Sequence, residues 1–387
     1  MTVKDRFNSV FNFEKNASPP RWEFGYWAGT ARRWYEEGLE CKSGVSTALK
    51  DGDSLRGGMG LLGDEFIDIK SVVGLDEPIA RFPLEMWIYP KYQQKILGQD
   101  DHGNIILLDE NGNKKLANKD NTTIAKVLEG PVKTREDWEQ LKAEKLDPAT
   151  AGRLPEDLAK AVSRHANREY PLTVGGPPVG FFGTLRELFG EPDVYFIFYD
   201  NPGLVREIVD YLADFWIELL DRTIHKIKPD CFNFWEDMCY KNGPMISPGL
   251  IEEFFSPVYK KMTHFLKGNG VNNILLDTDG DCSAVIPILL EAGIDGIYPM
   301  EVSAGMDVVA IRRQFPSLKI CGGLDKKALI AGKDEIAKEL DDKLDFMLQQ
   351  GGYIPFIDHH VPPDVPLENF VFYRKLLNRK IEDFSRN

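Results

Sequence analysis

The sequence has no run of apolar residues that approaches the roughly 18 needed to cross a membrane. Its first 16 residues, MTVKDRFNSVFNFEKN, carry charges throughout and lack the apolar centre of a signal peptide, so we expect a cytoplasmic protein. Cysteine is scarce as well, because the five cysteines lie far apart and form no CxxC pair. This spacing is typical of reduced thiols and argues against a disulfide framework.

Basic residues are fewer than acidic ones, since the chain has 47 Lys and Arg residues against 61 Asp and Glu residues, which gives a net charge of -14. Without a long basic run, neither a nucleic acid nor an anionic membrane is an expected partner. The phosphate loop GxxxxGK[ST] is absent too, and the single GxGxxG pattern, GMGLLG at residues 58–63, lies outside the regular alternation of strands and helices, which disfavours a nucleotide site. A small molecule or another protein remains as the expected ligand.

Short apolar strands alternate with helical stretches over residues 135–350. The predicted strands include LTVGG, CFNFW, NNILLDTD, DGIYPM and LKICGG, and each is followed by a segment of helical periodicity. Repeated strand and helix units predict an α/β fold with a parallel sheet, and the length suits a single (β/α)8 TIM barrel domain over residues 1–387. An open, doubly wound sheet is the alternative.

Two segments depart from this alternation. Residues 4–13 have the pattern of an N-terminal helix. Residues from about 86 to 132 contain short apolar runs separated by the turn sequences DDHGN and ENGN, which predict an antiparallel β insertion.

Acidic and imidazole side chains gather at the predicted carboxyl ends of the strands, which meet at one mouth of a parallel barrel. These residues are Glu236, Asp277, Asp279, Glu301, Asp358 and His359. So many converging carboxylates raise one another's pKa values unless a proton or a cation compensates them, and a divalent metal is the economical answer. Oxygen and imidazole ligands suit zinc or a harder cation. Because His359 and His360 are adjacent, at most one of them faces the mouth.

Each of these residues also has a structural interpretation. Asp277 and Asp279 in DTDGD are equally suited to capping a turn or a helix. Their spacing resembles part of a calcium loop, but Ile288 stands where the distal glutamate is needed. Glu301 fits a charge at a helix N-terminus, and Glu236 fits a pair with a buried basic residue.

The closing motif HHVPPDVPLEN resembles the last strand loop of the uroporphyrinogen decarboxylase superfamily, which also holds cobalamin-linked methyltransferases. The motifs NGPMISP, LLDTDGD, GIDGIYPMEV and CGGLDKKAL follow in the order of that superfamily, and PPRWEFGYWAG resembles its N-terminal block. The resemblance covers most of the chain and implies a closed (β/α)8 barrel.

Two departures disfavour the decarboxylase branch. That branch holds an acidic tetrapyrrole with arginines in an RQAGR-like block, and here GYWAGTARRW puts Tyr26 where the first arginine is expected. Its pyrrole-binding Asp lies in an FSDI-like block, for which residues 66–72 offer no convincing counterpart. An acidic mouth would also repel a substrate that carries many carboxylates.

The methyltransferase branch binds zinc through an HxC pair and a later cysteine. In this sequence the pair falls on Asp277 and Asp279, and the later position falls on His359. The resemblance therefore implies a zinc held by two carboxylates and an imidazole. Such ligands suit a Lewis acid acting on an oxygen or nitrogen that carries a methyl group better than activation of a thiol.

The leading hypothesis is a metal-assisted methyltransferase that moves a methyl group from a small O- or N-methylated compound to a corrinoid (cobalamin) protein. No DxHxxG motif occurs, so the corrinoid is expected on a separate partner protein. In this hypothesis Glu236, Glu301 and His359 are catalytic. The substrate-binding residues are Trp22, Tyr26, Trp27, Trp235 and Asp358, with the aromatic rings lining a slot.

Three alternatives stay open at this point. One is a decarboxylase of the uroporphyrinogen type, and another is a barrel that binds a small molecule without catalysis. The third concerns the aromatic residues, which are as well suited to packing a core as to lining a slot. A homodimer is compatible with the sequence.

Overall fold

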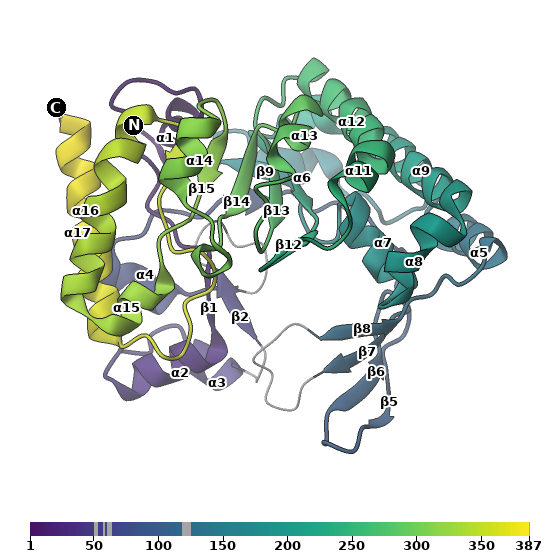
Figure 1. Ribbon diagram of the computed structural model, residues 1–387, viewed down its shortest axis with the longest axis horizontal. Coiled ribbons are helices and arrows are strands. Elements are labelled where there is room, and N and C mark those ends of the chain that lie inside the picture. The colour runs from purple at the N-terminus through teal and green to yellow at the C-terminus, as the bar shows by residue number, and fades with distance from the viewer. Residues whose placement is uncertain (50–52, 57–58, 60–63, 118–124, 387) are drawn as a thin grey trace.

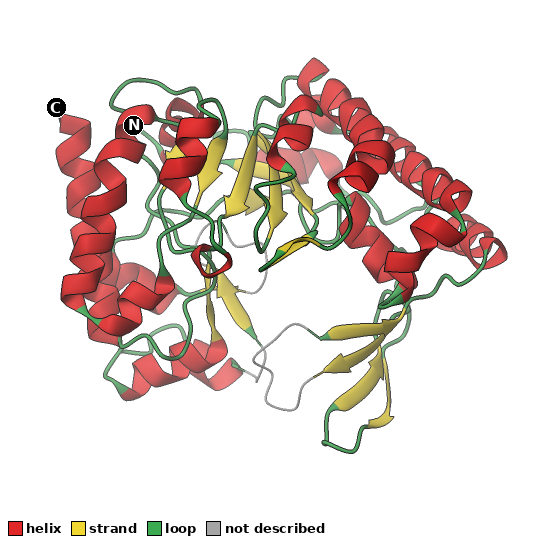
Figure 2. Ribbon diagram, in the orientation of Figure 1, coloured by secondary structure: helices red, strands yellow, loops and turns green. Residues whose placement is uncertain are grey.

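A curled sheet of seven parallel strands forms the centre of the computed structural model, which describes residues 1–49, 53–56, 59, 64–117 and 125–386. Its strands are, in spatial order, β16 (Tyr353–Ile354), β15 (Lys319–Cys321), β14 (Gly296–Pro299), β13 (Ile274–Thr278), β10 (Cys231–Trp235), β9 (Leu172–Gly175) and β4 (Ala80–Arg81). Helices cover the outer face of this sheet (Figures 1 and 2).

The N-terminal segment 21–27 lies between the two edges of the curled sheet. On one side Val361 N donates to Gly25 O at 2.8 Å, beyond the end of β16. On the other side Asp76 N donates to Arg21 O at 3.1 Å, just before β4. The segment thus takes the eighth position, and the predicted (β/α)8 barrel is confirmed.

The end of this segment belongs to a small second sheet at the barrel mouth. Its members are β1 (Gly25–Trp27), β2 (Ser54–Arg56) and β3 (Asp64–Glu65). A further pair follows β10 and consists of β11 (Cys239–Tyr240) and β12 (Gly243–Pro244).

The helices of the outer layer follow from periodic apolar residues and local capping. Pro202 stands at the first position of α9 and Asn201 caps it, a combination that favours helix initiation. Among the helices that the structure describes, none is both long and apolar enough to cross a membrane. Within the described residues, the α-helices after α1 (Val3–Phe11) are α2 (Ala28–Glu36), α3 (Val45–Ala48), α4 (Ile67–Val73), α5 (Arg135–Lys145), α6 (Leu158–Arg164), α7 (Phe181–Phe189), α8 (Asp193–Asp200), α9 (Pro202–Asp221), α10 (Ile224–Ile227), α11 (Pro248–Leu250), α12 (Ser256–Gly268), α13 (Ile286–Glu291), α14 (Val308–Gln314), α15 (Lys326–Ala331), α16 (Lys333–Gln350) and α17 (Leu367–Arg386).

The N-terminal helix α1 (Val3–Phe11) is shorter than the predicted 4–13. Thr2 and Asp5 form a capping box at its start, and Phe13 adopts a positive φ of 56°, which a continuing helix does not allow. The buried face of α1 joins an apolar cluster with side chains from inside the barrel. This helix therefore plugs the end of the barrel opposite the mouth.

The predicted antiparallel insertion is present as a four-stranded sheet. Its strands, in spatial order, are β5 (Lys95–Gln99), β6 (Ile105–Leu108), β7 (Lys114–Ala117) and β8 (Lys126–Glu129). The sheet projects from the barrel below α7 and α8 (Figure 1). Gly130 N donates to Phe189 O at 3.2 Å and so joins the end of β8 to the end of α7.

Candidate active site

Three aspartates meet where β10 and β13 end at the mouth. The parallel register places Trp235 beside Asp277, and Asp237 and Asp279 follow just beyond the ends of the two strands. Burial and the neighbouring Asp279 carboxylate raise the pKa of Asp237 to about 7. Burial, followed by repulsion from Asp237 and Asp279, raises the pKa of Asp277 well above its usual value. At neutral pH the cluster therefore retains at least one proton.

His359 faces this cluster from the loop after β16. Its Nε2 lies 3.5 Å from Asp279 Oδ2. Burial alone lowers the pKa of His359, but the Asp279 carboxylate outweighs burial and leaves the pKa above its usual value. Burial raises the pKa of Asp279, yet the bond to His359 leaves it below its usual value. The two side chains form an ion pair.

His360 points away from the ion pair, as expected for a neighbour of His359. Its ring is 5% exposed and lies with centroids 4.7 Å from Trp27 and 4.9 Å from Phe24. Burial lowers the pKa of His360 to about 3, so the ring is neutral. One histidine of the pair thus faces the mouth and the other packs among aromatic rings.

Glu301 and Asp358 share a lysine at the edge of the mouth. Lys326 Nζ lies 3.6 Å from Glu301 Oε1 and 3.3 Å from Asp358 Oδ2. Asp358 is fully buried and also accepts the N–H of Val302 at 2.9 Å. Asp358 therefore holds the loop after β14, whereas Glu301 borders a cavity together with Asp279.

Glu236 points outward from the barrel, opposite to Trp235 and Asp237. Its carboxylate accepts the N–H groups of Phe181 at 2.7 Å and of Gly183 at 3.0 Å, at the start of α7. The Tyr259 hydroxyl donates to it as well. Burial raises its pKa to about 7. The Glu236 carboxylate therefore anchors the start of α7. Its predicted catalytic role stays a prediction.

The four predicted substrate-binding aromatic residues divide into two groups. Trp22 and Tyr26 are fully buried in the hydrophobic core, which is the alternative that the sequence left open. Trp22 Nε1 donates to Glu77 O at 2.9 Å, far from the mouth aspartates along the barrel axis. Trp27 covers His360. Trp235 lines a cavity at the mouth.

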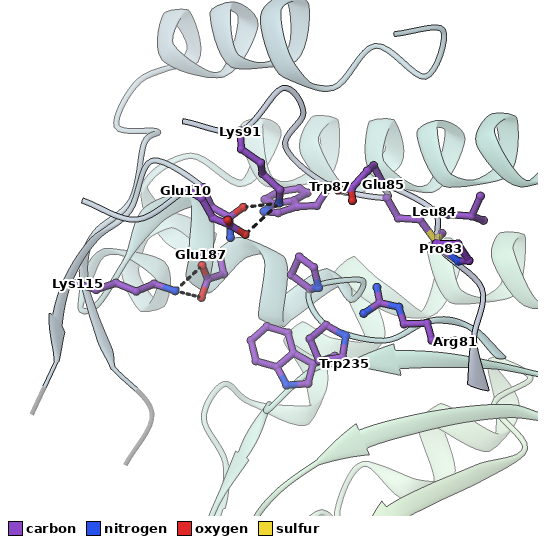
Figure 3. A pocket seen from close by; sticks show the side chains of 14 residues that line it. Arg81, Pro83, Leu84, Glu85, Trp87, Lys91, Glu110, Lys115, Glu187 and Trp235 are labelled. Carbon is purple, nitrogen blue, oxygen red and sulfur yellow. Dashed lines mark hydrogen bonds and ion pairs between the residues drawn. The ribbon is translucent and has the colours of Figure 1, made fainter. Parts of the chain in front are cut away.

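Two of the cavities that described residues line lie at this end of the barrel. The larger, of about 550 Å³, lies between the mouth and the β5–β8 sheet (Figure 3). It is lined by Arg81, Pro83, Leu84, Glu85, Met86, Trp87, Lys91, Glu110, Asn111, Lys115, Pro177, Pro178, Glu187 and Trp235. The second, of about 440 Å³, is bordered by Asp237, Asp279, Glu301 and Arg186 among others.

The predicted zinc ligands come together only in part. Asp279 and His359 are paired with each other, and Asp277 lies beside them on β13. Within the described ranges, no three His, Cys, Asp or Glu side chains are arranged to hold a metal ion. In this geometry the residues do not fit a zinc site, so zinc stays a prediction that only a measurement of the protein can test.

Sequence reasoning missed Asp237, the third aspartate of the cluster. Strand alternation could not place it, because β10 ends at Trp235 and Asp237 adopts a positive φ of 43° beyond that end. It also missed Arg186, whose Nη1 donates to Asp237 O at 2.9 Å. No pattern in the sequence links this helical arginine to the end of β10.

Residues 116–378 match the family model described as uroporphyrinogen decarboxylase (URO-D). Among solved structures, a methyltransferase from Methanosarcina mazei is 14% identical, covers 98% of each chain and has a TM-score of 0.58, so the two share a fold. A putative vitamin-B12 independent methionine synthase from Listeria monocytogenes is 10% identical over 58% of this chain and 65% of its own, with a TM-score of 0.35. No curated protein matches in sequence.

Proposed function

Because the chain belongs to the uroporphyrinogen decarboxylase family, we propose that it is an enzyme of that family's methyl-transferring kind. It would move a methyl group from a small O- or N-methylated compound to a corrinoid carried by a separate protein. The proposal rests on one observation, the carboxyl cluster of Asp237, Asp277 and Asp279 with its partner His359, which borders the cavity of about 440 Å³ through Asp237 and Asp279. The Methanosarcina mazei methyltransferase agrees with it, at the level of the fold.

The carboxyl cluster would supply the proton that the leaving group requires. When the bond between the methyl carbon and its oxygen or nitrogen breaks, the methyl group goes to the acceptor and the leaving atom gains a proton. Asp277 is suited to donate that proton, since burial and its acidic neighbours raise its pKa and keep it protonated. The Asp279 and His359 pair would orient the leaving atom, because its Nε2–Oδ2 contact fixes both side chains.

Decarboxylation is the second candidate, because the matching family is named for it. The arginine expected of that branch is replaced by Tyr26, which is buried in the core and cannot contact a substrate carboxylate. The aspartates at the mouth would also repel a substrate rich in carboxylates. Both features favour methyl transfer.

The test supplies free, reduced cobalamin as the acceptor, with methoxylated and methylamine compounds as donors. We expect donor-dependent methylation of cobalamin, followed by absorbance, and a loss of rate in His359→Ala. Release of carbon dioxide from a carboxylated substrate without methylation of cobalamin would favour the decarboxylase instead. Full methyl transfer by His359→Ala would remove that histidine from the site.

Zinc is tested separately by elemental analysis of the purified, chelator-washed protein. If the sequence prediction holds, the parent carries about one zinc per chain and both Asp279→Ala and His359→Ala lose it. Zinc retained in both variants would refute the ligand set. A parent without zinc would leave the carboxyl cluster to act through its protons alone.

A further inference from the structure

The insertion sheet ends in an open edge at β5. Within the described residues β5 pairs with β6 alone, and it lies at the outer edge of the projecting sheet (Figure 1). All five of its residues are exposed, and the side chains of Ile96 and Leu97 are 71% and 48% exposed. An edge strand with exposed apolar side chains is a template on which another strand can pair.

The insertion sheet receives little apolar support from the barrel. Its strand β6, Ile105–Leu108, consists of four apolar residues in a row, so apolar side chains lie on both faces and all of them are partly exposed. Of the described residues, neither these four nor Ile96 and Leu97 join the hydrophobic core or pack against it. A small sheet without a packed layer gains stability when further strands extend it.

The two ends of β5 carry opposite charges. Lys95 begins the strand and Asp101 lies in the turn just after it. Both are exposed, and in the part of the chain that the structure describes neither side chain forms a hydrogen bond or an ion pair. Asp100, by contrast, is used within the turn, where it accepts the N–H groups of His102 at 2.9 Å and of Asn104 at 2.8 Å. The edge therefore has one free cation at its start and one free anion beyond its end.

We propose that β5 pairs in antiparallel fashion with β5 of a second copy of this chain, which joins the two insertion sheets into one. A two-fold axis reverses the strand direction, so Lys95 of each copy approaches Asp101 of the other. Ile96 and Leu97 of the two copies lie near the axis and cover one another. A parallel pair is disfavoured, because it would place lysine beside lysine and aspartate beside aspartate.

Two features of β5 favour a second copy over an unrelated strand. The β-bulge between Ile96 and Gly98 increases the local twist, and both a bulge and an edge lysine discourage pairing with a foreign strand. In a symmetric pair the two strands have the same twist, and each lysine meets a carboxylate. One strand from each copy makes a small interface, so the dimer should be reversible and depend on concentration.

Sedimentation velocity of the whole protein over a series of concentrations tests the proposal. We expect the parent to change from monomer to dimer as the concentration rises. Lys95→Glu and Asp101→Lys each place like charges across the interface twice and should weaken the dimer about tenfold or more. An equimolar mixture of the two variants should recover the dimer, because both contacts then join opposite charges. Loss of structure in either variant could not produce that recovery.

A further variant tests the apolar centre of the interface. Ile96→Lys places two lysines near the two-fold axis and should also weaken the dimer about tenfold. Ile330→Lys is the matched control, since Ile330 is 41% exposed on α15, on the other side of the molecule from β5 (Figure 1). The control should dimerise as the parent does.

A parent that stays monomeric at every concentration would overturn the proposal, and so would a dimer that tolerates all three β5 variants. If the single charge variants dissociate but their mixture does not recover, the antiparallel contact between Lys95 and Asp101 is refuted. Methylation of cobalamin plays no part in these measurements, so the proposed function and the proposed dimer can each fail without the other.

Discussion

Two clusters of buried charge sit on either side of the larger cavity and differ in how they are balanced. At the junction of α7 with the insertion, Lys115 lies between the carboxylates of Asp109 and Glu187. Burial lowers the pKa of Lys115, but the two carboxylates outweigh burial and raise it, so the lysine is charged at any ordinary pH. At the mouth, by contrast, the three aspartates outnumber the cationic side chains paired with them, which are those of His359 and of Arg186, whose Nη1 lies 3.9 Å from Asp237 Oδ2.

This difference indicates that the junction cluster has a structural role and the mouth cluster a chemical one. A compensated cluster is stable only while all its members are present, because removing one leaves the others buried without a partner. An uncompensated cluster raises its own pKa values and so keeps protons ready for transfer near neutral pH. The junction should therefore respond to mutation mainly in stability, and the mouth mainly in activity.

The largest effect is expected at the mouth. Asp277→Asn keeps the shape of the side chain but removes its acidic proton, so methyl transfer to cobalamin should fall by about a hundredfold or more. The free energy of unfolding should change little, because the carboxyl group that is replaced already carries its proton and no charge. The rate is measured with free cobalamin, and unfolding is measured in urea.

Asp109→Asn is the matched control for this change, since it converts an equally buried aspartate in the compensated cluster. It should lower the free energy of unfolding and leave the rate per folded molecule close to that of the parent. If Asp277→Asn loses stability and keeps its rate, the assignment of chemistry to the mouth is wrong.

Lys115→Met should give the largest loss of stability at the junction. It leaves Asp109 and Glu187 buried without their cation, and we expect the free energy of unfolding to fall by about 3 kcal/mol. The neighbouring Lys114→Met breaks only an exposed pair with Glu129 and should cost less than about 1 kcal/mol. Equal losses in the two variants, measured by urea unfolding, would show that the junction cluster is not a structural unit.

Much of the fold is predictable from the sequence, because the signals for a (β/α)8 barrel are local. The strand that ends at Trp235 and the strand before Asp279 are visible as short apolar runs, and the turns of the insertion carry their own glycines and asparagines. The end of α1 lies at Phe11, two residues before the end that the sequence predicts. Its stop depends on the positive φ of Phe13, a residue type that gives no local signal for it.

The site is less predictable, because it depends on which way each side chain points. Side chains alternate along β10, so Trp235 and Glu236 point to opposite faces of the sheet. Because Cys231 lies inside the barrel, every second residue after it also faces inward, and Glu236 is expected outside the barrel. The larger cavity could not be predicted from the sequence, because Trp87 and Trp235 come to line it together only when the insertion packs on the barrel.

The smallest expected effect is a difference in how the free energy of unfolding depends on pH. Burial and Asp279 raise the pKa of Asp237 to about 7, against about 3.9 in an unfolded chain, so the folded protein binds this proton more tightly. Its contribution to stability is full below about pH 4 and is lost as the pH rises through 7. Between pH 5 and 8 the parent should therefore lose about 2 kcal/mol more of its free energy of unfolding than Asp237→Asn.

Urea unfolding of both proteins at pH 5, 6, 7 and 8 measures this difference directly. Lys114→Met provides the contrast, because it breaks only an exposed pair with Glu129 and should leave the slope of the stability curve between pH 5 and 8 unchanged. Parallel curves for the parent and Asp237→Asn would mean that Asp237 is ionised at neutral pH like an ordinary aspartate. Asp237 would then place a full negative charge beside Asp277, and Asp277 alone would hold the proton for the leaving group.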